Sequence, residues 1–167
     1  ISVQVDKSPQ ALCLYLACLR GGFVFHPLNP AFQAKELAYF LDNAEPAAIV
    51  CDSNKESIVR KIATAAGIER LYTLNATGQG SLIEQSESLS EDFLTVPRNK
   101  DDLAALLYSS GTTGFPKGVM LTHGNLLSNT EALVQSWKFT KDDRLLHALP
   151  IFHVHGLFVA IGCVLLS

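Results

Sequence analysis

The chain has 167 residues, of which 48% are hydrophobic and 17% are charged, and its formal net charge is −3. This composition excludes a disordered tail, which would be polar and rich in charge. The 13 Lys and Arg residues do not outnumber the 16 Asp and Glu residues, so the chain lacks the basic excess that holds a nucleic acid backbone. A bound phosphate would have to be held by a local loop.

The first half of the chain alternates predicted strands with predicted helices. We expect strands at 1–5, 23–25, 47–51 and 71–74, and helices at 10–19, 34–43 and 58–66. Ser8 and Pro9 predict the start of the first helix, because serine is a common helix cap and proline suits the first helical position. The alternation predicts an α/β fold with a parallel-type sheet covered by helices on both faces.

Residues 75–102 interrupt this alternation, because they are polar, acidic and rich in serine. They predict an irregular connection with a short helix near 82–85, either a linker between lobes or, as we expect, a surface excursion within one domain. Further on we expect a buried strand at 103–108, a short apolar piece at 119–121, a helix from 122 to 137, a strand at 144–149 and a buried helix at 156–166. The last apolar run is too short to span a bilayer.

The cysteines at 13, 18, 51 and 163 form no CxxC pair. They predict buried free thiols in a reducing compartment, and no metal site. Residues 1–4 carry neither the basic region nor the cleavage site that would predict a secretory signal. The chain starts in a strand-like run without Met and stops within an apolar segment, so we expect a truncated piece of a longer protein.

The stretch from Tyr108 to Val119 reads YSSGTTGFPKGV and follows a predicted buried strand. Consecutive backbone N–H groups and hydroxyls form an anion-binding concavity, and glycines let the backbone approach the ligand. Lys117 adds a positive charge. This loop suits the binding of a polyphosphate at the end of a strand, where open α/β sheets bind ligands.

The loop departs from the usual P-loop, because Pro116 stands where the second glycine belongs and Gly118 follows Lys117. A phosphoryl-transferring NTPase is therefore disfavoured. A mobile Gly/Ser linker is the other alternative, and it would not require Pro-Lys-Gly after a buried strand.

This loop resembles the signature loop of the acyl-adenylate-forming (AMP-binding) superfamily, which includes acyl-CoA synthetases, aryl-CoA ligases, luciferases and nonribosomal adenylation domains. A second motif of that superfamily is matched by LPIFHVHG at 149–156, and a weaker resemblance covers residues 3–52. Within the superfamily the chain most resembles malonyl-CoA synthetases.

The resemblance implies a ligase in which a carboxylate attacks the α-phosphorus of ATP, with Mg²⁺, to form an acyl-adenylate and pyrophosphate, after which coenzyme A displaces AMP. It implies that the β- and γ-phosphates are bound by Ser109, Ser110, Gly111, Thr112, Thr113, Gly114 and Lys117. His153 would lie beside the adenylate and the acyl carboxylate, and His155 with Gly156 would line the acyl pocket. A structural histidine is the alternative role for each imidazole, whereas zinc binding by the pair is disfavoured.

On this basis residues 1–167 are expected to form a partial N-terminal AMP-binding domain without its C-terminal lobe, inactive by itself. The alternatives are a non-catalytic nucleotide-binding remnant or a ligase for aryl or medium- to long-chain fatty acids. The expected partners are a small carboxylic acid, ATP, CoA and the rest of the same chain, without nucleic acid or a membrane span. We expect a cytoplasmic enzyme, or one in an organelle matrix.

Overall fold

The computed structural model describes residues 1–109 and 116–167, which divide into two compact units, Ile1–Val96 and Pro97–Ser167. The boundary lies within the irregular connection that the sequence predicted. That connection therefore links two compact units, and its interpretation as an excursion within one domain stays a prediction. Nearly all of the residues from 84 to 102 are exposed, so the connection contributes little to the hydrophobic core of either unit.

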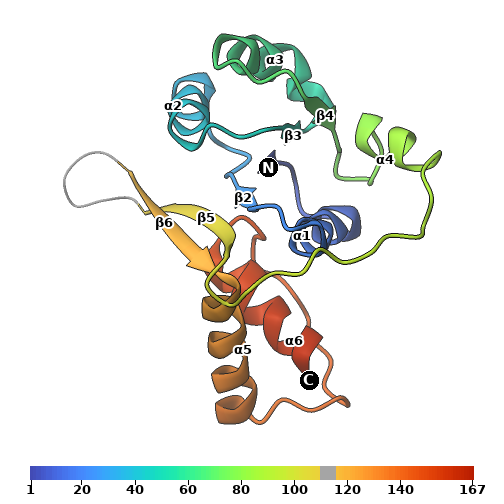
Figure 1. Cartoon of the computed structure of the whole chain (residues 1–167), viewed down its shortest axis with the longest axis vertical. Helices are drawn as coiled ribbons and strands as arrows, with labels where there is room; N and C mark the ends of the chain where they lie inside the picture. The colour runs from blue at the N-terminus through green and yellow to red at the C-terminus, as the bar shows by residue number, and fades with distance from the viewer. Residues whose placement is uncertain (110–115) are drawn as a thin grey trace. The chain divides into compact units, whose positions relative to one another are not determined.

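The first unit is built on a parallel sheet with the strand order β2-β1-β3-β4. Its strands are β1 (Ser2–Gln4), β2 (His26–Pro27), β3 (Ile49–Cys51) and β4 (Leu71–Thr73). Its helices are α1 (Pro9–Gly21), α2 (Ala34–Ala44), α3 (Glu56–Ala65), α4 (Ser81–Ser86) and the 3₁₀ turn η1 (Ser53–Lys55). Helix α1 lies on one side of the sheet, and α2 and α3 lie together on the other (Figure 1). The predicted α/β fold with a parallel sheet is confirmed.

Helix α1 begins where the sequence predicted. The Ser8 Oγ accepts a hydrogen bond from the Ala11 N–H at 3.1 Å, and the helix ends at Gly22. The strand predicted at 23–25 is wrong by position, because pairing with β1 places Ser2 opposite His26 and so defines the strand as His26–Pro27. Phe25 remains buried and packs edge-to-face on Tyr15, with ring centroids 5.2 Å apart.

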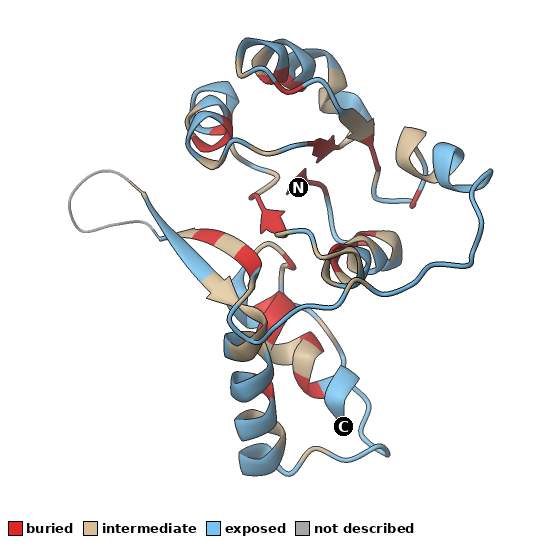
Figure 2. Cartoon of the chain, viewed as in Figure 1, coloured by how far each residue is buried: buried red, intermediate tan, exposed pale blue. Residues whose placement is uncertain are grey.

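The core of this unit lies on the two central strands, where β1 and β3 are buried along their whole length (Figure 2). Of the cysteines, Cys18, Cys51 and Cys163 are buried, whereas Cys13 is exposed, which corrects the expectation that all are buried. Helical periodicity explains the difference, because α1 turns Ala11, Tyr15 and Cys18 inward and Cys13 lies off that stripe. Burial raises the pKa of Cys51 to about 12, so this thiol stays protonated.

One edge of β4 is covered by the start of α4. The Thr73 N–H donates to Ser81 Oγ at 2.9 Å, and the Ser81 N–H donates to Thr73 Oγ1 at 2.9 Å. Gly80 permits this approach, because a Cβ on it would lie 2.4 Å from the Thr73 carbonyl oxygen, and its φ of +139° disfavours any side chain. The pair occupies backbone groups that a sheet edge would otherwise expose.

We expect Gly80→Ala to lower the free energy of unfolding by about 2–3 kcal/mol, because the new Cβ meets backbone in a disfavoured conformation. Gly67→Ala is the matched control. It also has a positive φ (+73°) but has nothing within 4 Å of the new Cβ, so it should cost only about 1 kcal/mol. Urea unfolding of both variants measures the difference, and equal losses would show that the close approach at Gly80 is unimportant.

The second unit contains an antiparallel hairpin and helices. Strand β5 (Leu103–Ser109) pairs with β6 (Lys117–Thr122), and α5 (His123–Trp137), the π-helical segment η2 (His155–Ile161) and α6 (Gly162–Leu166) follow. The Thr122 hydroxyl caps α5 by accepting from the Asn125 N–H at 3.1 Å, and the helix predicted from 122 to 137 is confirmed. Where we expected only a short apolar piece after the loop, the structure has a full strand antiparallel to β5.

The strand predicted at 144–149 is wrong. This segment has no regular structure and pairs with no strand in the described part of the chain. Leu146 is 94% exposed, and the Arg144 guanidinium donates to the carbonyls of Asp142 and Asp143 at 3.4 and 3.2 Å. An apolar run forms a strand only where a neighbouring edge can pair with it.

Among the described residues, no helix is long and apolar enough to cross a membrane.

Candidate functional site

The hairpin brings together the two described ends of the predicted phosphate loop. Ser109 is the last residue of β5 and Lys117 is the first residue of β6, and they stand directly opposite each other in the antiparallel register. Side chains of directly opposed residues lie on the same face of a sheet, with Cβ atoms about 5 Å apart. The side chains of Ser109 and Lys117 therefore leave neighbouring positions on one face of the hairpin, at the two ends of the loop.

The other predicted phosphate ligands lie outside the described residues. They are Ser110, Gly111, Thr112, Thr113 and Gly114. Their roles stay predictions.

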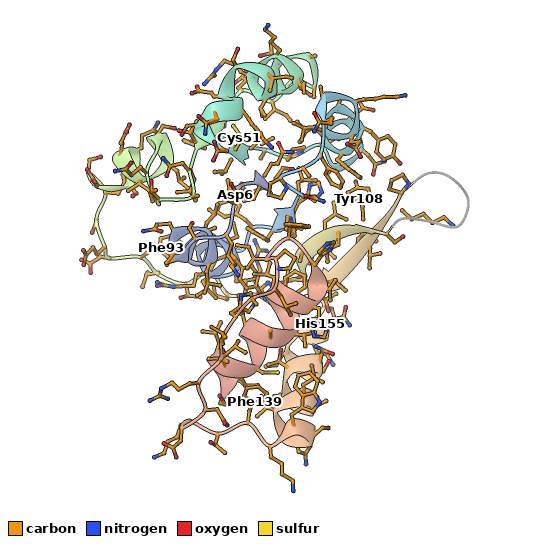
Figure 3. All side chains as sticks on the ribbon, turned by 180° about the vertical axis from the view of Figure 1, so that it is seen from behind. Asp6, Cys51, Phe93, Tyr108, Phe139 and His155 are labelled. Atoms are coloured by element: carbon orange, nitrogen blue, oxygen red, sulfur yellow. The ribbon has the colours of Figure 1, made fainter. Side chains whose placement is uncertain are left out.

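Lys117 is exposed and makes no ion pair with any residue that the structure describes. Tyr108 precedes the loop on β5 (Figure 3) and stands opposite Gly118 in the ladder. An ammonium group that is not neutralised by a carboxylate is available for an anion. The base of the loop thus offers one positive charge and one hydroxyl to a phosphate.

The second predicted motif forms the start of η2. His153 and His155 are exposed, whereas Gly156 is buried. The His153 carbonyl accepts the Leu157 N–H at 3.0 Å, which begins the helical turn. The ring of Phe152 lies beside the imidazole of His153, with centroids 4.4 Å apart and an interplanar angle of 49°. The exposed imidazole of His155 lies at the start of η2 (Figure 3).

Gly156 sits against the backbone of the loop that precedes it. A Cβ on Gly156 would lie 2.0 Å from the Pro150 carbonyl oxygen, so a side chain has no room there. Its own carbonyl oxygen lies 3.0 Å from Nε2 of His147. The sequence indicated no role for His147. This hydrogen bond could not be predicted from a residue pattern, because the partner of His147 is a main-chain atom.

The two motifs are not joined directly. Within the described ranges, no hydrogen bond or ring contact links His153 or His155 to Ser109 or Lys117. No group of three or more His, Cys, Asp or Glu residues that could hold a metal ion occurs in the part of the chain that the structure describes.

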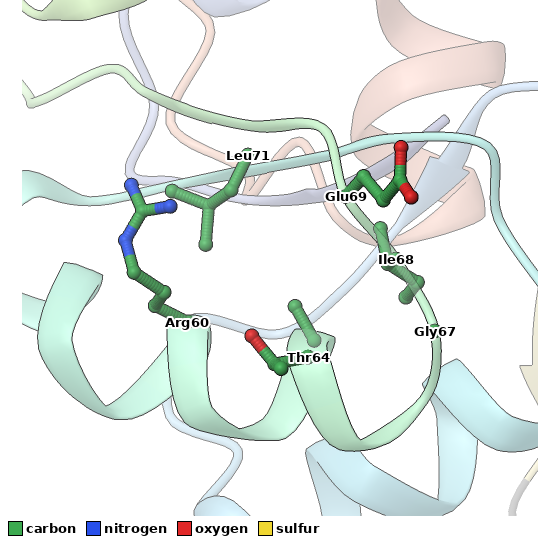
Figure 4. A pocket seen from close by; sticks show the side chains of 7 residues that line it. Arg60, Thr64, Gly67, Ile68, Glu69 and Leu71 are labelled. Carbon is green, nitrogen blue, oxygen red and sulfur yellow. The ribbon is translucent and has the colours of Figure 1, made fainter.

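A hollow of about 280 Å³ lies between α3 and β4, and no predicted site residue lines it (Figure 4). Arg60, Thr64 and Glu69 give it polar walls, and Leu71 and Ile68 add apolar ones. The Arg60 guanidinium is engaged by the Glu56 carboxylate one turn away, at 2.6 Å. A half-exposed pair of this kind contributes little to stability, and nothing in the hollow matches the phosphate chemistry of the hairpin.

Comparison with known proteins gives a consistent picture. The family described as AMP-binding enzyme matches residues 1–167. The ATP-bound crystal structure of MatB from Rhodopseudomonas palustris is 51% identical and superposes with a TM-score of 0.94 over 98% of this chain. The long-chain-fatty-acid–CoA ligase FadD1 of Archaeoglobus fulgidus is 32% identical, with a TM-score of 0.86 over 99% of the chain.

A curated relative has a name that specifies its acid. The mitochondrial malonate–CoA ligase ACSF3 of Xenopus laevis is 35% identical over 95% of this chain. The chain spans only 27% of that relative's length, and 32% of the length of the MatB chain and of the FadD1 chain.

Proposed function

The chain belongs to the AMP-binding enzyme family, and from this premise we propose that it is the N-terminal part of an ATP-dependent carboxylic acid–CoA ligase. The observation that carries the proposal is the hairpin, which pairs Ser109 with Lys117 at the two ends of a loop rich in glycine and hydroxyl groups. The sequence matches over the whole chain support it, since the named relatives are CoA ligases. Residues 1–167 are then a partial N-terminal domain.

In the first step the acid's carboxylate attacks the α-phosphorus of ATP and pyrophosphate leaves. The loop from Ser109 to Lys117, including Ser110, Gly111, Thr112, Thr113 and Gly114, would bind the β- and γ-phosphates. Catalysis of this kind rests on positioning and charge stabilisation. Lys117 would stabilise the charge that develops on the leaving pyrophosphate, and the Ser109 hydroxyl would donate to a phosphate oxygen.

Magnesium is expected to accompany ATP. Mg²⁺ bound to a nucleotide keeps phosphate oxygens and waters as most of its ligands, so it requires no carboxylate cluster in this part of the chain. The hydroxyl oxygen of Ser109 is a ligand of the kind that Mg²⁺ binds. Bound there, the ion would neutralise part of the triphosphate charge.

His153 is proposed as the catalytic imidazole beside the acyl carboxylate and the adenylate phosphate. An exposed imidazole can donate a hydrogen bond to a carboxylate and offset developing negative charge. His155 and Gly156 are proposed to line the acyl pocket. Coenzyme A would then attack the acyl carbonyl through its thiol and release AMP.

Malonate is the acid that we propose, because the Xenopus relative is named for it. Other members act on other acids, as the name of the Archaeoglobus ligase shows, so a fatty or aromatic acid is the second candidate. We propose the cytoplasm or an organelle matrix as the place of action, the latter because the Xenopus relative is mitochondrial.

The products of the reaction test the function. With ATP, malonate and CoA, the complete protein should release AMP and pyrophosphate in equal amounts and form malonyl-CoA, as followed by chromatography. Residues 1–167 alone should form no thioester. Release of ADP and phosphate would identify an NTPase instead, and ATP binding without turnover would identify a nucleotide-binding protein. Octanoate and benzoate, tested in parallel, separate the candidate acids.

A further inference from the structure

The segment that carries His153 lies largely at the surface, although Ile151 within it is buried. Leu146 is 94% exposed, Leu149 is 40% exposed, and both His153 and His155 face solvent. A loop with little buried area has a small free energy of opening. A side chain that must meet a reacting carboxylate needs a defined position, because displacement by about 1 Å can cost about 100-fold in rate. The contacts that close this loop therefore matter for chemistry.

His147 supplies one such contact. Its Nε2 lies 3.0 Å from the carbonyl oxygen of Gly156. A carbonyl oxygen only accepts hydrogen bonds, so Nε2 must carry the proton and donate. The bond joins two residues nine positions apart and closes the loop that contains His153.

The acceptor end of this bond is buried and closely packed. Gly156 is buried, and its Cα packs on the Pro150 carbonyl so closely that no Cβ fits. The next two residues, Leu157 and Phe158, are 1% and 4% exposed. His147 is thus fastened to a point in the core of the second unit, while the imidazole of His153 stands three residues before that point.

We propose that His147 is a positioning residue for adenylate formation, which holds the loop of His153 and His155 through its hydrogen bond to the Gly156 carbonyl. This inference rests on the proposed function. In this role His147 acts through the backbone, by its hydrogen bond to the Gly156 carbonyl, and is not proposed as a catalytic residue.

Two substitutions separate the hydrogen bond from the bulk of the ring. His147→Ala removes the donor, whereas His147→Gln places an amide N–H at a reach similar to that of Nε2. In the complete protein, His147→Ala should lower kcat of malonate-dependent ATP–pyrophosphate exchange about 10- to 100-fold and leave the KM for ATP within about twofold. His147→Gln should restore kcat to within about threefold of the wild type.

Hydrogen exchange measured by mass spectrometry reports the anchor without reference to activity. Peptides covering 148–157 should exchange at least about fivefold faster in His147→Ala and at nearly the wild-type rate in His147→Gln. The melting temperature should fall by no more than about 4 °C, since one partly exposed hydrogen bond is lost. Lys141→Ala, an exposed change in the same stretch of chain, is the control and should alter neither readout.

Each contrary result has a distinct meaning. Unchanged exchange in His147→Ala would overturn the anchor, whatever the activity. Faster exchange with an unchanged kcat would overturn the positioning role. A wild-type protein without ATP–pyrophosphate exchange would overturn the proposed function, and with it the positioning role, while the exchange data would still decide whether the anchor exists.

Discussion

Replacing Lys117 by alanine in the complete protein should lower the rate of acyl-adenylate formation about 100- to 1,000-fold. Lys117 supplies a positive charge at the mouth of the loop proposed to bind the leaving pyrophosphate, and removal of one such electrostatic contact costs about 3–4 kcal/mol in a transition state. Malonate-dependent ATP–pyrophosphate exchange measures the loss directly.

The structure indicates that this loss will not come from unfolding. Lys117 is exposed at the first position of β6, and its side chain makes no ion pair with the described residues. The melting temperature should therefore stay within about 2 °C of the wild type, as for surface changes in general. Lys117→Arg should retain part of the activity, because the charge is kept while the geometry changes.

Lys61→Ala provides the matched control. Lys61 is an exposed lysine on α3 and lies in the other unit, so its loss changes the net charge equally without touching the hairpin. It should leave the exchange rate unchanged. If Lys117→Ala is as active as Lys61→Ala, Lys117 does not bind the phosphates.

Acidification should destabilise the first unit through His26. His26 is 3% exposed on β2, and its pKa is lowered to about 4, mainly because burial disfavours the imidazolium ion and secondarily because the Ile1 ammonium group repels it. Its pKa in the unfolded chain is about 6.5. The unfolded state therefore binds the proton first, so stability is independent of this group above pH 7 and falls as the pH drops from about 6.5 toward 4.

The size of the effect follows from the two pKa values. The free energy of unfolding should fall by about 2 kcal/mol at pH 5 and by about 3 kcal/mol at pH 4 on account of His26 alone. Urea titrations between pH 7.5 and 4 measure the total dependence, which also contains the carboxylates. His26→Asn, which keeps a polar group near the Ser2 hydroxyl, should remove this share. A variant with the wild-type pH dependence would show that His26 is not buried as a neutral ring.

Local signals in the sequence were enough to place most elements of the first unit. Ser8 caps α1, as Ser8 and Pro9 predicted, and the helix predicted at 34–43 is confirmed as α2. A helix cap of this kind depends on a side chain that bonds to backbone within a few residues, so a linear pattern carries it. The position of β2 could not be read in this way, because it depends on its register against β1.

The same distinction applies to the candidate site. The composition of the loop from Ser109 to Lys117 indicated phosphate binding from the sequence, because consecutive glycines and hydroxyl residues are the residue types that form anion-binding loops. The hairpin that sets Ser109 opposite Lys117, and the bond from His147 to the Gly156 carbonyl, could not be predicted. The predicted strand at 144–149 failed for a related reason, since a strand requires a partner that its own residues do not specify.

By itself, then, the sequence determined the α/β class of the chain, the start of its first helix and the chemical character of the loop proposed to bind phosphate. Only the tertiary structure decided which residues meet: the register of β2, the antiparallel return of β6, the exposure of Cys13 and the anchor of the His153 loop. The physical reason is the range of the interactions. Caps and turns are formed between near neighbours, whereas registers, burial and main-chain contacts arise when distant segments pack.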